Sequence, residues 1–321
     1  MSSEPAAGIE LTAAATAALD CVGVDENDKV LIVCNEPQRS IADALEAAAQ
    51  GRAGGVTCIT YPELSRDGEE PPAFVSEAMG AATAIFAPTT YSLSHTEARM
   101  AATRRGARIA TMPGISPEIF ARAMPVDYAQ LGRAGSRIAS KLTAASTCRI
   151  TTPAGTDVVV DLTGRVAISD DGNLGGPAAW GNLPAGEGYI APLEGKGEGT
   201  IVYDGALAGH GLLEEPVRVR LENGRAVSAE GAVGAWLLET LDAGGPNGRS
   251  VAEIGIGTNP AATLSGNILE DEKVIGTVHL AFGMSASLGG ENVASVHIDG
   301  MMLTPTVELD GRELMGDGKL L

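Results

Sequence analysis

The sequence predicts an α/β protein with two domains: a doubly wound α/β domain over residues 1–145, followed by a mostly β (α+β) domain over residues 146–321. A chain of 321 residues suggests two cores, because single cores usually stop growing near roughly 250–300 residues. Apolar strands alternate with helices in the first part, which favours a parallel sheet covered on both faces. From Cys148 onward, short alternating strands and glycine-rich turns indicate the β-rich second domain.

The elements of the first domain follow from its apolar runs. Lys29–Cys34 is an almost continuous apolar run, which is typical of a strand buried on both faces. The predicted strands are 29–34, 55–61, 82–86 and 108–111, and the predicted helices are 9–19, 41–49, 73–79 and 94–105. Neither the dinucleotide fingerprint G-x-G-x-x-G nor the phosphate loop G-x-x-x-x-G-K-[ST] occurs after the first strand, so no nucleotide cofactor is predicted.

Local signals organise the second domain. A long helix over residues 127–144 is predicted to join the two domains. Asn223-Gly224 lies between two alternating runs, which predicts a β-hairpin at this point. One amphipathic helix, residues 232–241, interrupts the strands.

Charge and composition exclude some classes of partner. The formal net charge of −19 argues against a nucleic acid or an anionic membrane surface. No apolar run has the length of a membrane span, and the acidic start of the chain lacks the features of a signal peptide. The four cysteines are widely spaced without a C-x-x-C motif, as expected for free thiols in a reducing compartment. We therefore expect a soluble, cytoplasmic, acidic protein.

Three predicted strands near the C-terminus carry groups that bind metal ions. They are residues 251–257 with Glu253, residues 276–283 with His279, and residues 294–300 with His297 and Asp299. Because side chains alternate between the faces of a strand, His297 and Asp299 share one face and apolar residues occupy the other. Two histidines and an aspartate are ligand types of Zn, Mn and Fe(II) sites. The sequence thus predicts a metal site, with purely structural roles as the alternative.

Glu187 is a further candidate in the second domain. It follows a tight loop that begins at Asn182, and it stands between Gly186 and Gly188 where a strand begins. Glycines at such positions let backbone or ligand approach closely. A surface turn with an ordinary solvated glutamate is the alternative interpretation.

These motifs together resemble a known family. The order and approximate spacing of N-x-P-x-x-E at 182–187, the strand glutamate, G-T-V-H-L-A-F-G and H-I-D at 297–299 resemble the thermophilic metalloaminopeptidases, aminopeptidase T and aminopeptidase S. The resemblance implies an N-terminal α/β domain, a C-terminal catalytic domain, a homodimer and a zinc, cobalt or magnesium pair. The implied ligands are Glu187, Glu253, His279, His297 and Asp299. One position departs from the pattern, because Ala286 stands where the family has a tyrosine.

The same fold resembles a second activity, that of the 2,5-dihydroxypyridine 5,6-dioxygenases. Members of this group hold one Fe(II) with two histidines and one aspartate, and His279, His297 and Asp299 match that set. His95, at the predicted start of a helix in the first domain, is then a candidate acid or base that faces the metal. A solvent-exposed histidine at a helix start is the alternative.

Three functions are therefore ranked. The first is a hydrolase with Zn, Co or Mn that releases N-terminal residues from peptides, in which the catalytic carboxylates Glu187 and Glu253 bridge two ions or supply a general base. The second is an Fe(II) ring-cleaving dioxygenase. The third is a binding protein with a vestigial site. The expected substrate is a small peptide or another small molecule.

Overall fold

The computed structural model describes residues 4–321, with side chains from residue 11 onward. Within it the chain divides into two compact units. The first runs to Gln130 and takes in Asp170–Ala185, and the second comprises Leu131–Ser169 and Gly186–Leu321. An α/β unit and a β-rich unit are both present, so the predicted fold class is confirmed.

The first unit is built on a parallel five-stranded sheet with the order β2-β1-β3-β4-β8. Its strands are β1 (Lys29–Cys34), β2 (Gly55–Thr60), β3 (Ala84–Thr89), β4 (Arg108–Pro113) and β8 (Trp180–Asn182). Every residue of β3 is buried, and so is every residue of β1 after Lys29. This burial explains the continuous apolar runs, because a strand with helices on both faces has no solvent-facing side.

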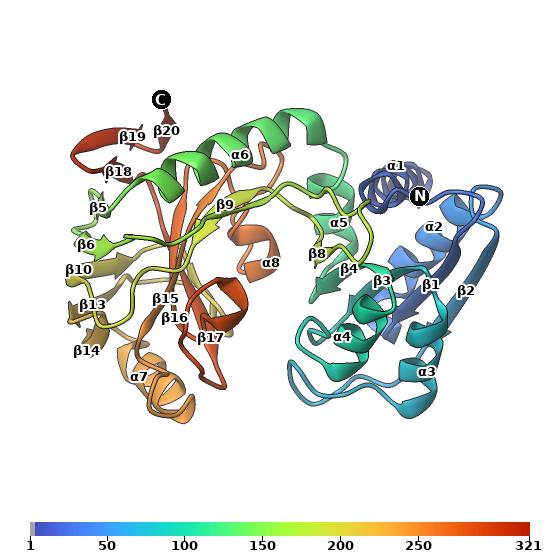
Figure 1. Ribbon diagram of the computed structural model, residues 1–321, viewed down its shortest axis with the longest axis horizontal. Helices are drawn as coiled ribbons and strands as arrows, with labels where there is room; N and C mark the ends of the chain where they lie inside the picture. Colours follow the sequence, from blue (N-terminus) through green and yellow to red (C-terminus); the bar gives the residue numbers. More distant parts are fainter. Residues whose placement is uncertain (1–3) are drawn as a thin grey trace. The chain divides into compact units, whose positions relative to one another are not determined.

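Helices cover both faces of this sheet. They are α1 (Glu4–Val22), α2 (Arg39–Ala49), α3 (Ala73–Ala81), α4 (Glu97–Arg104) and α5 (Pro117–Ala123), with a short 3-10 turn η1 (Glu36–Gln38) before α2. In Figure 1, α1, α2 and α5 pack together on one face, and α3 and α4 pack together on the other. The arrangement is doubly wound, as predicted. Helix α4 begins later than the predicted residue 94, because the hydroxyl of Thr96 accepts the N–H of Arg99 and caps the helix there.

The second unit contains two mostly antiparallel sheets. The larger has the order β14 (Arg225–Glu230), β13 (Val217–Glu222), β10 (Glu198–Tyr203), β6 (Asp157–Asp161), β5 (Thr147–Thr151), β18 (Thr306–Leu309), β19 (Arg312–Gly316) and β20 (Lys319–Leu320). The other has the order β12 (Gly211–Leu212), β11 (Ala206–Leu207), β17 (His297–Met302), β16 (Val278–Gly283), β15 (Val251–Gly257), β9 (Glu187–Ile190) and β7 (Ile168–Asp170).

One hydrophobic core joins both sheets of the second unit. It contains Val158 and Val160 from β6 together with Ile254 from β15 and Leu280 from β16. The helices of this unit are α6 (Tyr128–Ala144), α7 (Gly234–Ala243) and α8 (Ile268–Asp271), with a short 3-10 turn η2 (Ala286–Leu288). The predicted hairpin is confirmed: β13 and β14 are joined at Asn223-Gly224, both with positive φ, as a two-residue turn of this kind requires.

The units differ from the predicted division after residue 145 in two places. Most of α6 belongs to the second unit, since Ile138 and Leu142 on its buried face are part of the second core. Residues 170–185 return to the first unit, because β8 adds to the edge of the parallel sheet beside β4. The pairing joins Ile109 to Trp180 and Thr111 to Asn182.

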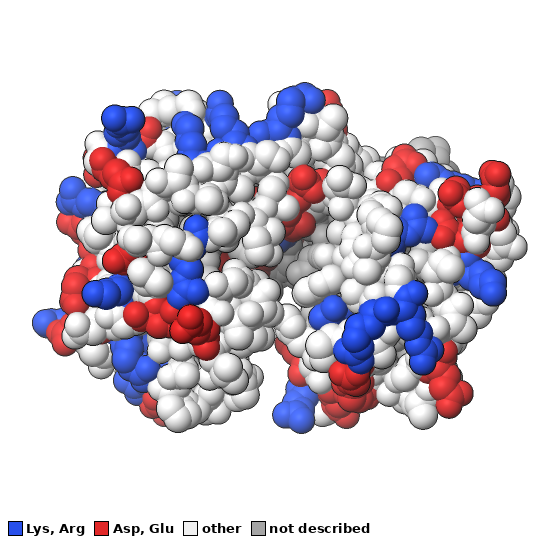
Figure 2. Space-filling view, in the orientation of Figure 1, with Lys and Arg blue, Asp and Glu red and all other residues white. Residues whose placement is uncertain are grey.

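The surface carries both signs of charge. On the face shown in Figure 2, acidic and basic side chains are interspersed. Among the residues that the structure describes, no helix is long and apolar enough to cross a lipid bilayer.

Candidate metal centre

Four neighbouring strands of the smaller sheet bring the predicted site residues to one face. Across β15, β16 and β17, Glu253 pairs with Ala281, and Ala281 pairs with Asp299. Two residues further along β15, Gly255 pairs with His279, and after two more residues Gly257 pairs with Glu187 of β9. His297 lies opposite Gly283. Because the rows are two residues apart, all five polar side chains project from the same side of the sheet.

The small residues beside these groups make the room that the site needs. A Cβ atom on Gly255 would lie 2.1 Å from the ring atoms Cε1 and Nε2 of His279 and 3.0 Å from Oε2 of Glu187. The ring of His279 therefore lies directly over the backbone of β15. On the opposite face of these strands, Ile254, Ile256 and Leu280 are fully buried in the core. The alternation predicted from sequence holds on all three C-terminal strands.

Most of the polar face is buried as well. His279 is fully buried, and Glu187, Glu253 and Asp299 are 4–6% exposed. The side chain of His297 is 25% exposed and is the most accessible of the five. Buried charged groups are costly unless they are paired or bind a cation.

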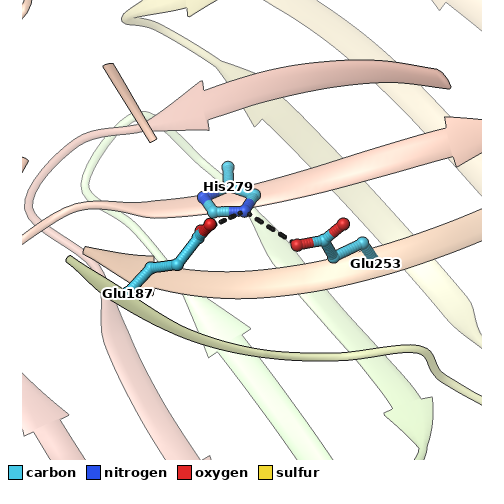
Figure 3. Close-up of side chains that lie close together, drawn as sticks. All are labelled: Glu187, Glu253 and His279. Carbon is cyan, nitrogen blue, oxygen red and sulfur yellow. Dashed lines mark hydrogen bonds and ion pairs between the residues drawn. The ribbon is translucent and has the colours of Figure 1, made fainter. Parts of the chain in front are cut away.

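The five side chains form a chain of close contacts with Glu253 at its centre. Nε2 of His279 lies 3.2 Å from Oε2 of Glu187 and 3.4 Å from Oε1 of Glu253, so that the ring nitrogen stands between two carboxylates (Figure 3). Nε2 of His297 lies 3.3 Å from Oε2 of Glu253 and 3.4 Å from Oδ1 of Asp299. Each histidine thus approaches a different oxygen of the same glutamate.

These contacts define two candidate ligand groups. The first group is Glu187, Glu253 and His279, and the second group is Glu253, His297 and Asp299; within each, one ligand atom per residue lies within 4.8 Å of the others. Among the described residues, no such group contains both histidines. The shared Glu253 is therefore the residue that links the two halves of the site.

The donor atoms fit a divalent cation. Oε2 of Glu187 and Oδ1 of Asp299 are buried and accept no hydrogen bond from the described residues; their nearest basic partners are the histidine Nε2 atoms at 3.2 Å and 3.4 Å, and a cation at this place would satisfy both oxygens. Nδ1 of His297 lies 2.8 Å from the carbonyl oxygen of Met284. A proton on Nδ1 donated to this carbonyl leaves the lone pair of Nε2 free for a metal, the usual arrangement of histidine ligands. Glu187, Glu253, His279, His297 and Asp299 remain predicted ligands, now with a geometry that suits the role.

The carboxylates shift the protonation of both histidines in the metal-free protein. Burial disfavours the charged imidazole, but Glu187 and Glu253 outweigh it and raise the pKa of His279 to about 9. Burial acts in the same way on His297, and Asp299 and Glu253 raise its pKa well above the ordinary value. Burial favours the neutral acid of Glu253, yet the two histidines hold its pKa well below the ordinary value. Protons on the imidazoles thus neutralise carboxylates where a cation would do so in the loaded protein.

This arrangement predicts that metal stabilises the protein more at high pH. The raised pKa of His279 means that its stabilisation of the metal-free fold is complete below pH 6.5 and is lost as the pH rises through about 9. A bound cation replaces those protons, so the loaded protein should not share the loss. We expect the difference in Tm between Zn(II)-loaded and metal-free protein to widen from pH 6.5 to 9, measured by differential scanning fluorimetry. A difference that stays constant or narrows would contradict this reading of the site.

The structure adds a residue that the sequence analysis missed, Lys273. Its ammonium group contacts Oε1 of Glu187 and lies 3.0 Å from Oε2 of Glu272, and its side chain is 1% exposed. In sequence, Glu270 to Lys273 is a run of charges, which ordinarily indicates a solvated face. Here Glu270 and Asp271 are also fully buried, and their carboxylates accept the backbone N–H groups of Thr263 and Ser265, which reduces the cost of burying them.

Two other predicted positions lie elsewhere. His95 belongs to the first unit, where it is exposed and its ring meets Trp180 edge-on at 6.3 Å between centroids. It immediately precedes Thr96, the cap of α4. Ala286, which replaces the tyrosine of the aminopeptidases, is exposed at the start of η2. An acid–base role for His95 remains a prediction.

Comparison with known proteins shows the family. The model of the 2,5-dihydroxypyridine 5,6-dioxygenase family matches residues 10–321. The chain belongs to this family. A comparison with curated protein sequences found no match.

Solved structures share the fold of this 2,5-dihydroxypyridine 5,6-dioxygenase family member. The structure of 2,5-dihydroxypyridine dioxygenase from Pseudomonas putida KT2440 aligns with a TM-score of 0.82 at 20% identity, over 98% of this chain and 97% of that one. Wild-type AmpT from Thermus thermophilus aligns with a TM-score of 0.72 at 20% identity, over 97% and 99% of the two chains. Both resemblances predicted from sequence are confirmed. Family membership and the two ligand groups together support a metal-binding enzyme.

Proposed function

We propose that the protein is a ring-cleaving dioxygenase that uses Fe(II) and acts on a hydroxylated pyridine or a closely related ring. The observation that carries this proposal is the family match over residues 10–321, on a chain that presents two histidines and an aspartate on one face of β16 and β17. Two histidines and one carboxylate are the ligand set of many non-haem Fe(II) oxygenases. Oxygenation is thus ranked ahead of the peptide hydrolysis that the sequence motifs placed first.

The residues of the site would divide the work as follows. His279, His297 and Asp299 would hold the ion; the two histidines belong to different ligand groups of the metal-free site, and Glu253, which contacts both, joins those groups. Bound Fe(II) supplies the redox chemistry that makes dioxygen reactive toward an organic ring. The carbonyl of Met284 fixes the orientation of the His297 ring through Nδ1. The burial of His279 and Glu253 keeps bulk water from that side of the site, which strengthens its electrostatic interactions. His297, the most exposed of the set, marks the side that substrate reaches.

Peptide hydrolysis is the second candidate, and one observation favours it. Glu253 belongs to both ligand groups, and a carboxylate shared by two ions is suited to a two-metal hydrolase. The alanine at position 286 argues against peptide hydrolysis. It removes a phenol of the aminopeptidases, and loss of one group that stabilises a tetrahedral intermediate typically costs about 10²–10³ in rate. Oxygenation does not need that group.

The test is to load metal-free protein separately with Fe(II), Mn(II), Co(II) and Zn(II) and to measure two reactions for each. Oxygen uptake in the presence of 2,5-dihydroxypyridine is measured with an oxygen electrode, and amide cleavage is measured with a leucyl-arylamide as substrate. We expect oxygen uptake with Fe(II) alone and no appreciable amide cleavage with any metal. Amide cleavage with Co(II) or Zn(II), without oxygen uptake, would reverse the ranking. No reaction of either kind would favour a binding protein with a vestigial site.

The variant Ala286→Tyr separates the two candidates further. If hydrolysis is the native reaction, restoring the phenol should raise amide cleavage. If oxygenation is the native reaction, the change should leave oxygen uptake unaltered, because a ligand set of two histidines and one aspartate does not include this position.

A further inference from the structure

The peptide group between Met284 and Ser285 orients the ring of His297. Its carbonyl oxygen lies 2.8 Å from Nδ1 of His297, and its N–H donates to the carbonyl of Asn292 at 3.0 Å. Because a peptide group is planar, one orientation serves both contacts, and a rotation of the group would turn the carbonyl away from the ring. The ladder between β16 and β17 does not fix this rotation, since the bond from the N–H of Met284 to the carbonyl of Val296 belongs to the preceding peptide group.

A carboxylate from outside this loop, residues 284–296, holds the two sides of the loop together. Glu194, in the segment after β9, accepts the N–H of Glu291 at 2.7 Å and the hydroxyl of Ser285 at 3.3 Å, both through Oε1. The Ser285 hydroxyl is buried and also accepts the N–H of Asn292 at 3.1 Å. Gly290 leaves room for this approach, because a Cβ atom there would lie 2.1 Å from Oγ of Ser285 and 2.9 Å from Oε1 of Glu194. Glu194 thus holds the residue whose N–H belongs to the orienting peptide group.

Arg165 fixes this carboxylate in turn. Its Nη2 contacts Oε2 of Glu194, and its Nη1 donates to the carbonyl of Gly289 in the loop at 2.8 Å. Burial favours the neutral acid of Glu194, yet the N–H of Glu291 and the charge of Arg165 hold its pKa below the ordinary value. The side chain of Arg165 is 11% exposed, and its Nε is buried without a hydrogen-bond partner among the described residues. A buried pair with an unsatisfied donor is a weak source of stability, which favours a role in holding one conformation of the loop.

We infer that Glu194, held by Arg165, is a positioning residue that keeps the carbonyl of Met284 turned toward Nδ1 of His297 and so keeps Nε2 aimed at the metal ion. The inference rests on the metal dependence in the proposed function, and not on which reaction follows. In the part of the chain that the structure describes, neither Glu194 nor Arg165 forms an ion pair with a candidate ligand. Their effect on the metal would therefore pass through the loop.

The test follows one ring proton and one affinity. Metal-free wild-type and Glu194→Ala proteins carry isotope-labelled histidine, and NMR measures how fast the ring N–H of His297 exchanges with solvent, with His297→Ala used to assign the resonance. We expect at least about tenfold faster exchange in Glu194→Ala, because the loop loses hydrogen bonds to a charged group. Affinity for Fe(II), titrated under nitrogen, should fall about tenfold, as for other residues that orient a ligand.

Asp157→Ala is the matched control. Asp157 also pairs with an arginine of the second unit, since Nε of Arg149 lies 2.9 Å from its Oδ1, but it belongs to β6 of the larger sheet. Removing this carboxylate should leave both the exchange rate and the Fe(II) affinity within about twofold of wild type. An equal effect of Asp157→Ala and Glu194→Ala would show a general loss of rigidity and would overturn the inference.

Three further results would also overturn it. They are a ring N–H of His297 that exchanges freely in wild type, a folded Glu194→Ala protein with the exchange rate of wild type, and faster exchange with unchanged Fe(II) affinity. If Glu194→Ala does not fold, Glu194→Gln replaces it, since its amide oxygen still accepts the N–H of Glu291 but lacks the charge that holds Arg165. A wild-type protein that binds no Fe(II) would instead refute the metal dependence of the proposed function, and the exchange rate would still decide whether Glu194 positions the ring.

Discussion

The variant His297→Ala should lose both its metal and its oxygen uptake while keeping its fold. His297 faces Glu253 and Asp299 through Nε2, and its other nitrogen is anchored to the carbonyl of Met284. Changing only a partner that orients a ligand typically costs about 10- to 100-fold in metal affinity, so loss of a direct ligand should cost more than about 100-fold. Isothermal titration with Fe(II) under nitrogen and oxygen uptake with 2,5-dihydroxypyridine measure the two effects.

The matched control is His210→Ala. His210 is an exposed histidine of the second unit that packs on Trp236 at 5.3 Å between ring centroids. Among the described residues, no ion pair joins it to a candidate ligand. Metal affinity and oxygen uptake of His210→Ala should stay within about twofold of wild type, in line with the small effect of most surface substitutions. If His297→Ala binds Fe(II) as wild type does, the second ligand group is not the metal site.

The class of the fold could be predicted because its signals are local. Apolar runs such as Lys29–Cys34 mark buried strands, and Asn223-Gly224 marks a hairpin, wherever the segment lies in the chain. The limits of the two units could not be predicted in this way. Trp180–Asn182 is three residues long, and only its pairing with β4 makes it part of the parallel sheet. The apolar face of α6 likewise predicts that the helix packs against a core, but it does not indicate which of the two cores.

The candidate site shows the same division between local and distant information. Alternation within each strand is enough to place Glu253, His279, His297 and Asp299 opposite the apolar faces of their strands. The loop and the glycines around Glu187 supplied the fifth candidate. Which carboxylate oxygen lies beside which histidine depends on the register between the strands, and this register places Glu253 between the two histidines. Lys273 escaped notice because it lies in a run of charges, and only the backbone bonds of the turn after α8 reveal that the run is buried.

The second large effect is expected from Gly255→Ala, a change of one methyl group. The added Cβ would lie 2.1 Å from the ring of His279 in a fully buried position, so the ring must move or the strand must shift. Overpacking of this kind typically costs about 1–3 kcal/mol of stability. Because the displaced ring nitrogen lies between Glu187 and Glu253, metal affinity should also fall by about 10- to 100-fold, as for other changes that misorient a ligand.

Gly55→Ala provides the matched control, since Gly55 also lies in a strand but has open space where a Cβ would stand and no positive φ. There the methyl group should leave metal affinity unchanged and should stabilise the protein by about 0.4–1 kcal/mol, chiefly by restricting the unfolded chain. Urea unfolding of the metal-free proteins and Fe(II) titration give the two quantities. Should Gly255→Ala match Gly55→Ala in both, the ring of His279 does not need its place over the backbone of β15, and the tight geometry of the first ligand group has no part in holding the metal.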